Sequence, residues 1–185
     1  SEFECDSIIG CTGFRNAFPF FDEAHPDLSE AARTPRNNYK QIFNPAFGSE
    51  VAFFGFARPA FGAIPPTTEM QARYYAMIIN GDLQLPSREE MEAIAMKDRL
   101  NYDGRFGYDC KRVKGLVDFQ VYCDDLAQLM GCFPPMAELF VKKPAIWWSI
   151  MFGPFTMHQY RLAGPYANPQ RAEEVYSRQP VGDFL

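Results

Sequence analysis

Apolar residues recur at helical spacing in the middle of the chain. They stand at i, i+4, i+7 and i+8, so they share one face of a helix: Met70, Tyr74, Met77 and Ile78. Thr67 or Thr68 is expected to cap the start of this helix, and Asn80-Gly81 is expected to end it. The pattern therefore predicts an amphipathic helix that buries one side.

Further helices are predicted from their caps. Residues 87–90, Ser-Arg-Glu-Glu, have the form of a capping box, and the apolar positions behind them indicate a helix to about Leu100. Pro135 and Pro144 stand where first helical turns accept proline. Gly131 closes a helix over 123–130, and further helices are predicted over the following ranges: 136–141, 145–152 and 170–178.

Two segments have the composition of strands. Residues 4–11 run into a glycine-punctuated turn, and the continuous apolar run 51–56 is typical of a fully buried strand. Between them we expect an irregular aromatic loop over 14–22 and a polar, proline-broken surface excursion over 23–38. Two strands and several helices do not complete a sheet. The predicted fold class is α+β or an incomplete α/β fold, rich in helix with a few strands.

Composition excludes several classes of function. The 185 residues are 47% hydrophobic, and 18 Lys plus Arg against 23 Asp plus Glu give a net charge of −5. Without a basic stripe, nucleic acid is a poor partner. The longest nearly uncharged apolar run, 144–155, is about half of the roughly 20 residues that a membrane-spanning helix needs, so no transmembrane segment is expected.

The cysteines and histidines point to a reducing compartment. Five cysteines form an odd set without a CxxC pair, and the two histidines lie far apart in sequence. This pattern favours reduced thiols and a cytoplasmic location, and it predicts no metal site. No N-glycosylation sequon and no charged-then-apolar leader support secretion.

Common catalytic arrangements are missing from the sequence. There is no GxSxG, His25 and His158 lack neighbouring acids, and the Asp124-Asp125 pair points to different sides of a helix. GxGxxG and GxxxxGK[ST] are absent as well, so the chain alone cannot build the usual dinucleotide or P-loop phosphate cradle. We assign no catalytic residue.

Two segments remain as candidate binding sites. At the end of the first strand, residues 10–13, Gly-Cys-Thr-Gly, would let the backbone approach a ligand, although a plain tight turn explains them about equally well. Residues 55–71 read as strand, rigid loop and helix start, and a helix start favours an anion. Every capped helix has this property, so the feature alone is weak.

Taken together and in order, several motifs resemble the later part of flavin-containing monooxygenases. They are Asp-Ser-Ile-Ile-Gly-Cys-Thr-Gly-Phe at 6–14, Tyr-Lys-Gln-Ile-Phe-Asn-Pro at 39–45, the stretch 55–73 with Glu-Met-Gln-Ala-Arg at its end, Tyr-Cys-Asp-Asp-Leu-Ala at 122–127 with Met-Gly-Cys at 130–132, Phe-Gly-Pro at 152–154, and Gln-Tyr-Arg-Leu-Ala-Gly-Pro at 159–165. The resemblance covers nearly the whole chain. Each motif is short, but the ordered set is specific.

This resemblance implies an enzyme that binds FAD and NADPH and passes one oxygen atom of O2 to a soft nitrogen or sulfur nucleophile. Both glycine fingerprints of the family lie upstream of the matching part. The chain then corresponds to the C-terminal piece of a flavoprotein with two dinucleotide-binding domains. In that piece, residues 1–22 form a strand and crossover into the FAD domain, and 23–185 close that domain as one structural unit.

The resemblance also sets expectations for cofactors and partners. The parent enzyme uses FAD and NADPH, whereas this chain alone should retain neither and should be inactive. Its partner is the N-terminal portion that carries the fingerprints. Because the two predicted strands need neighbours that the chain does not supply, we also expect self-association through exposed edges.

The same resemblance assigns cofactor contacts to five residues. Thr12 and Gly13 correspond to the strand end that lines the flavin, Gly55 follows the buried strand, and Thr68 and Gln71 lie where a helix starts near the flavin ring. Gln71 is predicted to reach flavin, nicotinamide or substrate, and the alternative is a polar residue on a surface helix. An acidic residue that related flavoproteins place after the glycine is absent, so the ribityl contact stays unassigned.

The closing region has an aromatic stripe at 147–152. In the family this region packs over the active-site side or approaches membranes, but helix packing is the simpler explanation. Residues 159–161 are expected to fix the tail by hydrogen bonds and an ion pair. The lack of a hydrophobic tail after 185 favours a soluble protein. The alternative function is that of a non-catalytic interaction module that uses this aromatic helical surface.

Overall fold

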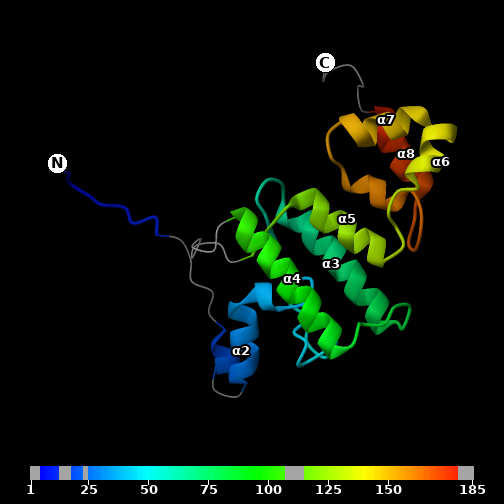
Figure 1. Ribbon diagram of the computed structural model, residues 1–185. Helices are drawn as coiled ribbons and strands as arrows, with labels where there is room; N and C mark the ends of the chain where they lie inside the picture. Colours follow the sequence, from blue (N-terminus) through cyan, green and yellow to red (C-terminus); the bar gives the residue numbers. More distant parts are fainter. Residues whose placement is uncertain (1–4, 13–17, 23–24, 107–114, 179–185) are drawn as a thin grey trace. The chain divides into compact units, whose positions relative to one another are not determined.

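The computed structural model describes residues 5–12, 18–22, 25–106 and 115–178. It divides the chain into two compact units, Ser1–Arg33 and Thr34–Leu185. The first unit contains the short helix α1 (Pro19–Asp22) and helix α2 (Pro26–Arg33). The second contains the remaining elements (Figure 1). The helix-rich fold class is confirmed.

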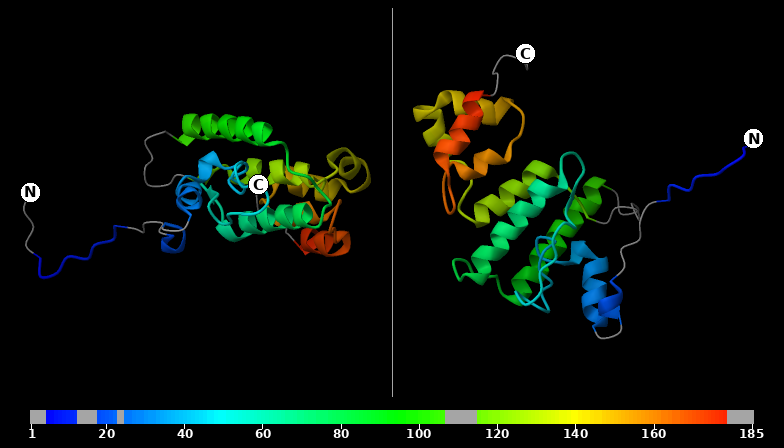
Figure 2. Two further views of the ribbon diagram at one scale, coloured as in Figure 1. Left: turned by 90° about the horizontal axis from the view of Figure 1, so that it is seen from below. Right: turned by 180° about the vertical axis from the view of Figure 1, so that it is seen from behind.

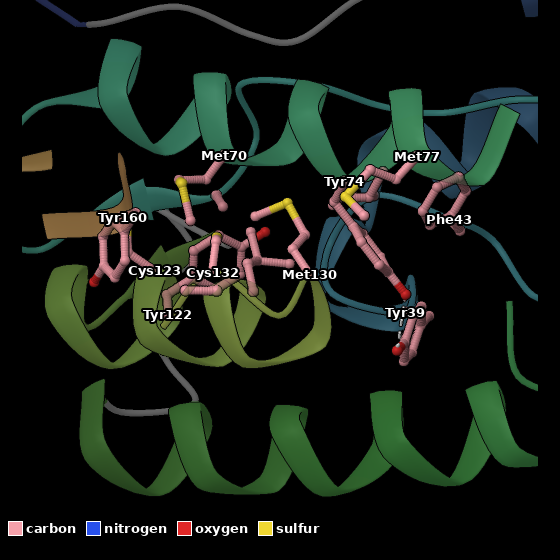
Figure 3. Close-up of a cluster of buried hydrophobic side chains, with 14 of the residues drawn as sticks. Tyr39, Phe43, Met70, Tyr74, Met77, Tyr122, Cys123, Met130, Cys132 and Tyr160 are labelled. Atoms are coloured by element: carbon pink, nitrogen blue, oxygen red, sulfur yellow. Dashed lines mark hydrogen bonds between the residues drawn. The ribbon is translucent and has the colours of Figure 1, made fainter. Parts of the chain in front are cut away.

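Three helices of the second unit surround the main core. They are α3 (Ile64–Ile79), α4 (Arg88–Phe106) and α5 (Phe119–Leu129). The two views of Figure 2 show α3 and α5 side by side. Buried side chains of both helices meet between them, among them Met70 and Tyr74 of α3 and Tyr122 and Cys123 of α5 (Figure 3).

Side-chain caps determine where α4 and α5 begin, and the cap of α4 is the one predicted from sequence. Ser87 N–H donates to the Glu90 carboxylate (2.9 Å), and Glu90 N–H donates to Ser87 Oγ (3.3 Å), which is the predicted capping box. Helix α4 continues past the expected end at Leu100. Helix α5 starts earlier than expected, because the Asp118 side chain accepts a hydrogen bond from Val121 N–H.

Three shorter helices form a second cluster. They are α6 (Met136–Lys142), α7 (Pro144–Phe152) and α8 (Pro169–Arg178), within a residue or so of the predicted ranges. Leu139, Leu162, Ala172 and Tyr176 are buried between them. The 3-10 helix η2 (Met157–Arg161) leads from α7 to α8. Arg161 pairs with Glu69 of α3 (2.7 Å), so the expected ion pair of the tail is confirmed.

Both predicted strands are wrong. Residues 5–12 lie outside any strand, and Ile8 and Ile9 are 87% and 86% exposed. Residues 51–56 form one isolated bridge, Phe43 to Ala52, in place of a strand. A run of apolar residues becomes a strand only when another strand offers its backbone groups along its length. Among the described residues the first run has no such neighbour, and the second has only the bridge to Phe43.

The described part of the chain holds one small sheet. Strand β1 (Arg58–Pro59) pairs in parallel with β2 (Leu116–Val117). Arg58 N–H donates to the Gly115 carbonyl (2.7 Å), and Ala60 N–H donates to the Val117 carbonyl (3.0 Å). Pro59 has no N–H, but it lies between these two donors, so the pairing loses no hydrogen bond.

The expected surface excursion also contains regular structure. Within 23–38 the chain forms α2 and the 3-10 helix η1 (Pro35–Asn37). The prolines that suggested a broken segment stand at helix starts, Pro26 at the first position of α2 and Pro35 at the first position of η1. Helix α1 falls within the expected aromatic loop, of which residues 14–17 lie outside the described residues.

Among the described residues, no helix combines the length and apolar character that crossing a membrane requires.

Two glycines with the same backbone conformation provide a test of the packing between the two clusters. Gly164 and Gly81 have φ angles of 79° and 80°. A methyl group at Gly164 would lie 2.1 Å from the Gly131 carbonyl oxygen, whereas one at Gly81 would meet nothing within 4 Å. Gly164→Ala should therefore lose about 2–4 kcal/mol of unfolding free energy, because about 1–3 kcal/mol of overpacking adds to the backbone strain. Urea denaturation measures the loss.

Gly81→Ala is the matched control, and it should lose only the strain of a left-handed alanine, about 1 kcal/mol. Equal losses for the two variants would contradict the close approach of the Gly164 and Gly131 segments.

Candidate functional site

Three of the residues predicted to contact a cofactor lie together in the second unit. Gly55 N–H donates to Gln71 Oε1 (3.0 Å), and a side chain at Gly55 would begin 3.7 Å from Thr68 Oγ1. Thr68 and Gln71 are three residues apart on α3, so they lie on the same side of that helix. Gly55 has φ 79°, a left-handed conformation that glycine adopts without strain.

The Gln71 side chain is directed into the protein. It is 0% exposed, and its Nε2 donates to the Tyr122 hydroxyl on α5 (2.8 Å). The alternative that Gln71 is a polar residue on a surface helix is therefore wrong. Both polar atoms of its amide are bonded within the chain, so Gln71 lies on the buried side of Gly55. Its contact with flavin, nicotinamide or substrate stays a prediction.

Tyr122 extends these hydrogen bonds to the segment that carries Lys40. Its hydroxyl donates to the Lys40 carbonyl (2.5 Å), and the ring is buried between α3 and α5. Figure 3 shows Tyr122 among the buried side chains of this core. We call the set Gly55 N–H, Gln71 amide, Tyr122 hydroxyl and Lys40 carbonyl the Gln71 network. Burial raises the pKa of Tyr122 well above its usual value, so the hydroxyl stays protonated.

Lys40 joins the network to α4 and α5 by charge. Its ammonium lies 2.7 Å from Asp125 and 3.2 Å from Asp98, and the residue is only 8% exposed. Burial lowers the pKa of Lys40, but the hydrogen bond and charge of Asp125, together with Asp98, outweigh this effect and raise the pKa above its usual value. Lys40 and Gln41 both have positive φ, 52° and 56°.

A small polar cavity lies beside Lys40. Its volume of about 10 Å3 is close to the space that one water molecule needs, so it is too small for a substrate. Both amide atoms of Gln41 are buried there with no partner among the described residues. The lining residues come from the Lys40 turn, α4 and α5: Arg36, Asn38, Lys40, Gln41, Asp98, Arg99, Tyr102 and Tyr122.

The start of α3 differs from the prediction. The helix begins at Ile64, ahead of the expected caps, and Thr67 and Thr68 donate from Oγ1 to the carbonyls of Ala63 (3.2 Å) and Ile64 (3.0 Å). Residues 65 and 66 are prolines and have no N–H. The helix dipole remains, but the first turn offers fewer N–H donors to an anion than a usual helix start.

The two other predicted contacts fall outside the second unit. Thr12 is exposed and belongs to the first unit, and Gly13 lies outside the described residues. Their roles stay predictions.

The two neighbouring aspartates of α5 serve different partners, as expected from their positions on a helix. Asp124 accepts a hydrogen bond from the Tyr160 hydroxyl (2.6 Å), whereas Asp125 pairs with Lys40. Burial raises the pKa of Asp124, and the hydrogen bond from Tyr160 opposes this effect in part. In the described part of the chain, no group of three or more His, Cys, Asp or Glu could hold a metal ion.

Sequence reasoning missed Tyr122 and Lys40. Lys40 lies in the stretch Tyr39 to Phe43, whose apolar residues indicate burial, and a lysine in a buried stretch signals an ion pair. Nothing in the sequence around Tyr122 indicates its hydrogen bonds, because its partners lie 51 and 82 residues away.

Removing the Tyr122 hydroxyl tests the Gln71 network. Tyr122→Phe leaves Gln71 Nε2 and the Lys40 carbonyl without these partners in a buried site, so the unfolding free energy should fall by about 1–3 kcal/mol. Chemical denaturation monitored by circular dichroism measures the change.

Tyr75→Phe is the control on the neighbouring helix. The Tyr75 ring contacts Phe43 and Phe54, and these contacts survive in phenylalanine. Its effect should stay within about 0.5 kcal/mol. If Tyr122→Phe were as mild, the network would contribute nothing to stability.

The buried tyrosines predict loss of stability in alkali. Burial raises the pKa of Tyr122, Tyr74 and Tyr160 above the usual value of 10, so the folded chain keeps protons that the unfolded chain loses. The raised pKa of Lys40 acts in the same direction. Burial also raises the pKa of the Cys123 and Cys132 thiols, so they begin the same loss at a lower pH. Stability should be constant up to about pH 8, fall gently as the thiols of the unfolded chain ionise, and above about pH 10 fall further, by about 1.4 kcal/mol per pH unit for each tyrosine held protonated.

Denaturation curves between pH 7 and 11.5 measure this loss, with tyrosinate absorbance as the second signal. Tyr122→Phe should make the alkaline slope shallower. An unfolding free energy that is the same at pH 9 and pH 11 would refute this prediction.

Comparison with known proteins identifies the family. The family model described as "Flavin-binding monooxygenase-like" matches residues 1–174. The 4-hydroxybenzoate brominase (decarboxylating) of Marinomonas mediterranea is 37% identical over 177 residues, which are 96% of this chain and 33% of the relative. The corresponding brominase of Pseudoalteromonas luteoviolacea is 34% identical and covers 92% and 32%.

A mammalian relative gives a similar match. Dimethylaniline monooxygenase (N-oxide-forming) 2 of Oryctolagus cuniculus is 34% identical over 165 residues, which are 89% of this chain and 30% of the relative. The chain thus spans about a third of the length of the curated relatives it matches. The resemblance inferred from the motifs is confirmed, and this chain belongs to the flavin-binding monooxygenase-like family.

Proposed function

We propose that this chain is the C-terminal piece of a flavin-dependent monooxygenase and forms one wall of its flavin pocket. The parent enzyme would use FAD, NADPH and O2 to oxygenate a soft nitrogen or sulfur nucleophile, and this piece alone would be inactive. The observation that carries the proposal is the family match over residues 1–174 together with the coverage of only a third of each relative.

The geometry around Gly55 is compatible with a flat ligand. Gly55 is partly exposed and has no side chain, and within 4 Å the missing side chain would meet only Thr68 Oγ1. The backbone at this point is therefore open to a ring that approaches closely. The Thr68 hydroxyl is partly exposed beside it, so it could accept a hydrogen bond from the ligand while donating to the Ile64 carbonyl.

Each residue has a distinct part in this proposal. A bound flavin would supply the redox chemistry, accepting electrons from NADPH and activating O2. Helix α3 would favour negative charge near its start through its dipole, with few N–H donors because of the two prolines. Gln71 would act as a positioning residue, because it accepts a hydrogen bond from the Gly55 backbone on its buried side and is itself fully buried. Thr12 and Gly13 would line the flavin from the first unit.

A second candidate function rests on the exposed aromatic residues of α6 and α7. Phe140, Trp148 and Phe152 are large, apolar and exposed. Such a surface could serve a non-catalytic interaction module with an unrelated partner.

Cofactor retention distinguishes the two functions. The purified 185-residue chain should emerge without the yellow colour of FAD and should not oxidise NADPH. Production together with the remaining two thirds of the Marinomonas relative should give a complex that retains FAD, and that remainder alone should retain less. The measurements are flavin absorbance after gel filtration and the rate of NADPH oxidation.

A yellow, NADPH-consuming chain on its own would refute the proposal that it is a piece. Failure of the remainder to bind the chain would favour the interaction module.

A further inference from the structure

Helix α7 is apolar all round. Its nine residues, Pro144–Phe152, include no charged side chain, and its one hydroxyl, Ser149 Oγ, donates to the Ala145 carbonyl of the same helix (3.0 Å). Ile146 and Ile150 pack on the cluster of α6 and α8. A helix that is hydrophobic on every side is normally buried on every side. The outer side of α7 therefore needs a cover.

Trp147 also packs on the cluster of α6 and α8 and is half-buried. From it a continuous set of aromatic rings runs onto the uncovered side of α7. Ring contacts run from Phe140 to Trp147 (5.0 Å), from Trp147 to Phe152 (6.2 Å) and from Phe152 to Trp148 (4.4 Å). Phe140, Trp148 and Phe152 are 58%, 49% and 59% exposed. We call these four residues the aromatic patch. Figure 1 shows α6 and α7, which carry it, side by side.

The surroundings of the patch do not fit a lipid surface. An interfacial membrane helix has a strongly charged face, and α7 has no charge. The two lysines at the corner between α6 and α7 are already paired, Lys142 with Glu138 (2.9 Å) and Lys143 with Glu173. They therefore add little attraction for anionic headgroups. Aromatic residues without charge at the centre are instead typical of the core of a protein interface.

The length of the relatives indicates which protein covers the patch. About two thirds of each relative lies outside the region that this chain matches. Interfaces between parts that are always together resemble a domain core cut in half, as the outer side of α7 does. We propose that the aromatic patch is the surface on which the remaining two thirds of the flavin-binding monooxygenase-like protein pack. This inference rests on the proposed function and names the surface by which the piece joins the rest.

The tryptophans provide a local probe. The chain has two tryptophans, Trp147 and Trp148, and both belong to the patch. In the chain labelled with 5-fluorotryptophan, 19F NMR reports on this surface even when the unlabelled partner has tryptophans of its own. The partner is the remaining two thirds of the Marinomonas relative. Its addition should shift the Trp148 resonance and protect it from a soluble paramagnetic quencher.

Substitutions test whether the patch carries the association. Trp148→Glu and, separately, Phe152→Glu should each weaken binding of the remainder at least about tenfold, because a buried aromatic anchor is replaced by a charge. Trp148→Phe should restore most of the affinity. Circular dichroism melting verifies that each variant is folded.

Met96→Glu on α4 is the matched control. Met96 is about half exposed, like Trp148, but its exposed apolar neighbour one turn along α4 is aliphatic, Leu100, and the residues between them are charged. Its effect on binding should stay within about twofold.

Three results would overturn the inference while leaving the proposed function intact. They are unchanged binding by both glutamate variants, a complex in which Trp148 remains open to the quencher, and a dimer of the chain alone that Trp148→Glu dissociates. Protection of Trp148 by phosphatidylcholine–phosphatidylglycerol vesicles, without protection by the remainder, would also overturn it. If the unsubstituted chain does not bind the remainder at all, the proposed function itself fails.

Discussion

The second unit depends on a buried primary amide, that of Gln71. An amide in a core needs partners for its polar atoms, and each one left without a partner costs about 1–3 kcal/mol. The chain supplies partners from two segments, the Gly55 backbone and the Tyr122 hydroxyl, and Tyr122 in turn requires an acceptor at Lys40. Apolar packing of α3 on α5 alone would allow one helix to shift slightly along the other. Hydrogen bonds of fixed length and direction do not, so the network specifies one arrangement.

The same requirement explains the unusual turn at Lys40. Two consecutive residues with positive φ are unfavourable for side chains other than glycine. The turn directs the Lys40 carbonyl to Tyr122 and the Lys40 ammonium to Asp125 of α5 and Asp98 of α4. Breaking it would leave a buried charge and a buried carbonyl without partners, which costs more than the strain. Through this residue α4, α5 and the Gly55 segment are fixed relative to one another.

The helices were predictable from sequence because their signals are local. The capping box at Ser87 and the prolines at the starts of α6 and α7 act within one turn, so the surrounding fold changes little. The sequence pattern places the start of α3 too late, because threonine favours the N-cap, whereas the hydroxyls of Thr67 and Thr68 donate to carbonyls one turn back. Gln71 could have been recognised as buried: it lies on the stripe of Thr67, Met70 and Tyr74. Its partners could not, since the segments that carry Gly55 and Tyr122 come together only in three dimensions.

Under the proposed function, the wrong strands and the exposed rings have one physical cause. A sequence pattern encodes burial in the complete protein, and it does not record which chain supplies the cover. Ile8 and Ile9 are neighbours, so in an extended segment they face opposite sides, and both sides are exposed. A strand that is apolar on both faces belongs inside a sheet covered on both faces, just as α7 belongs inside a helical layer. Under the proposed function, both covers come from the same absent two thirds. The expectation of exposed strand edges that associate then becomes a narrower one, in which these surfaces bind the rest of the enzyme in preference to a second copy.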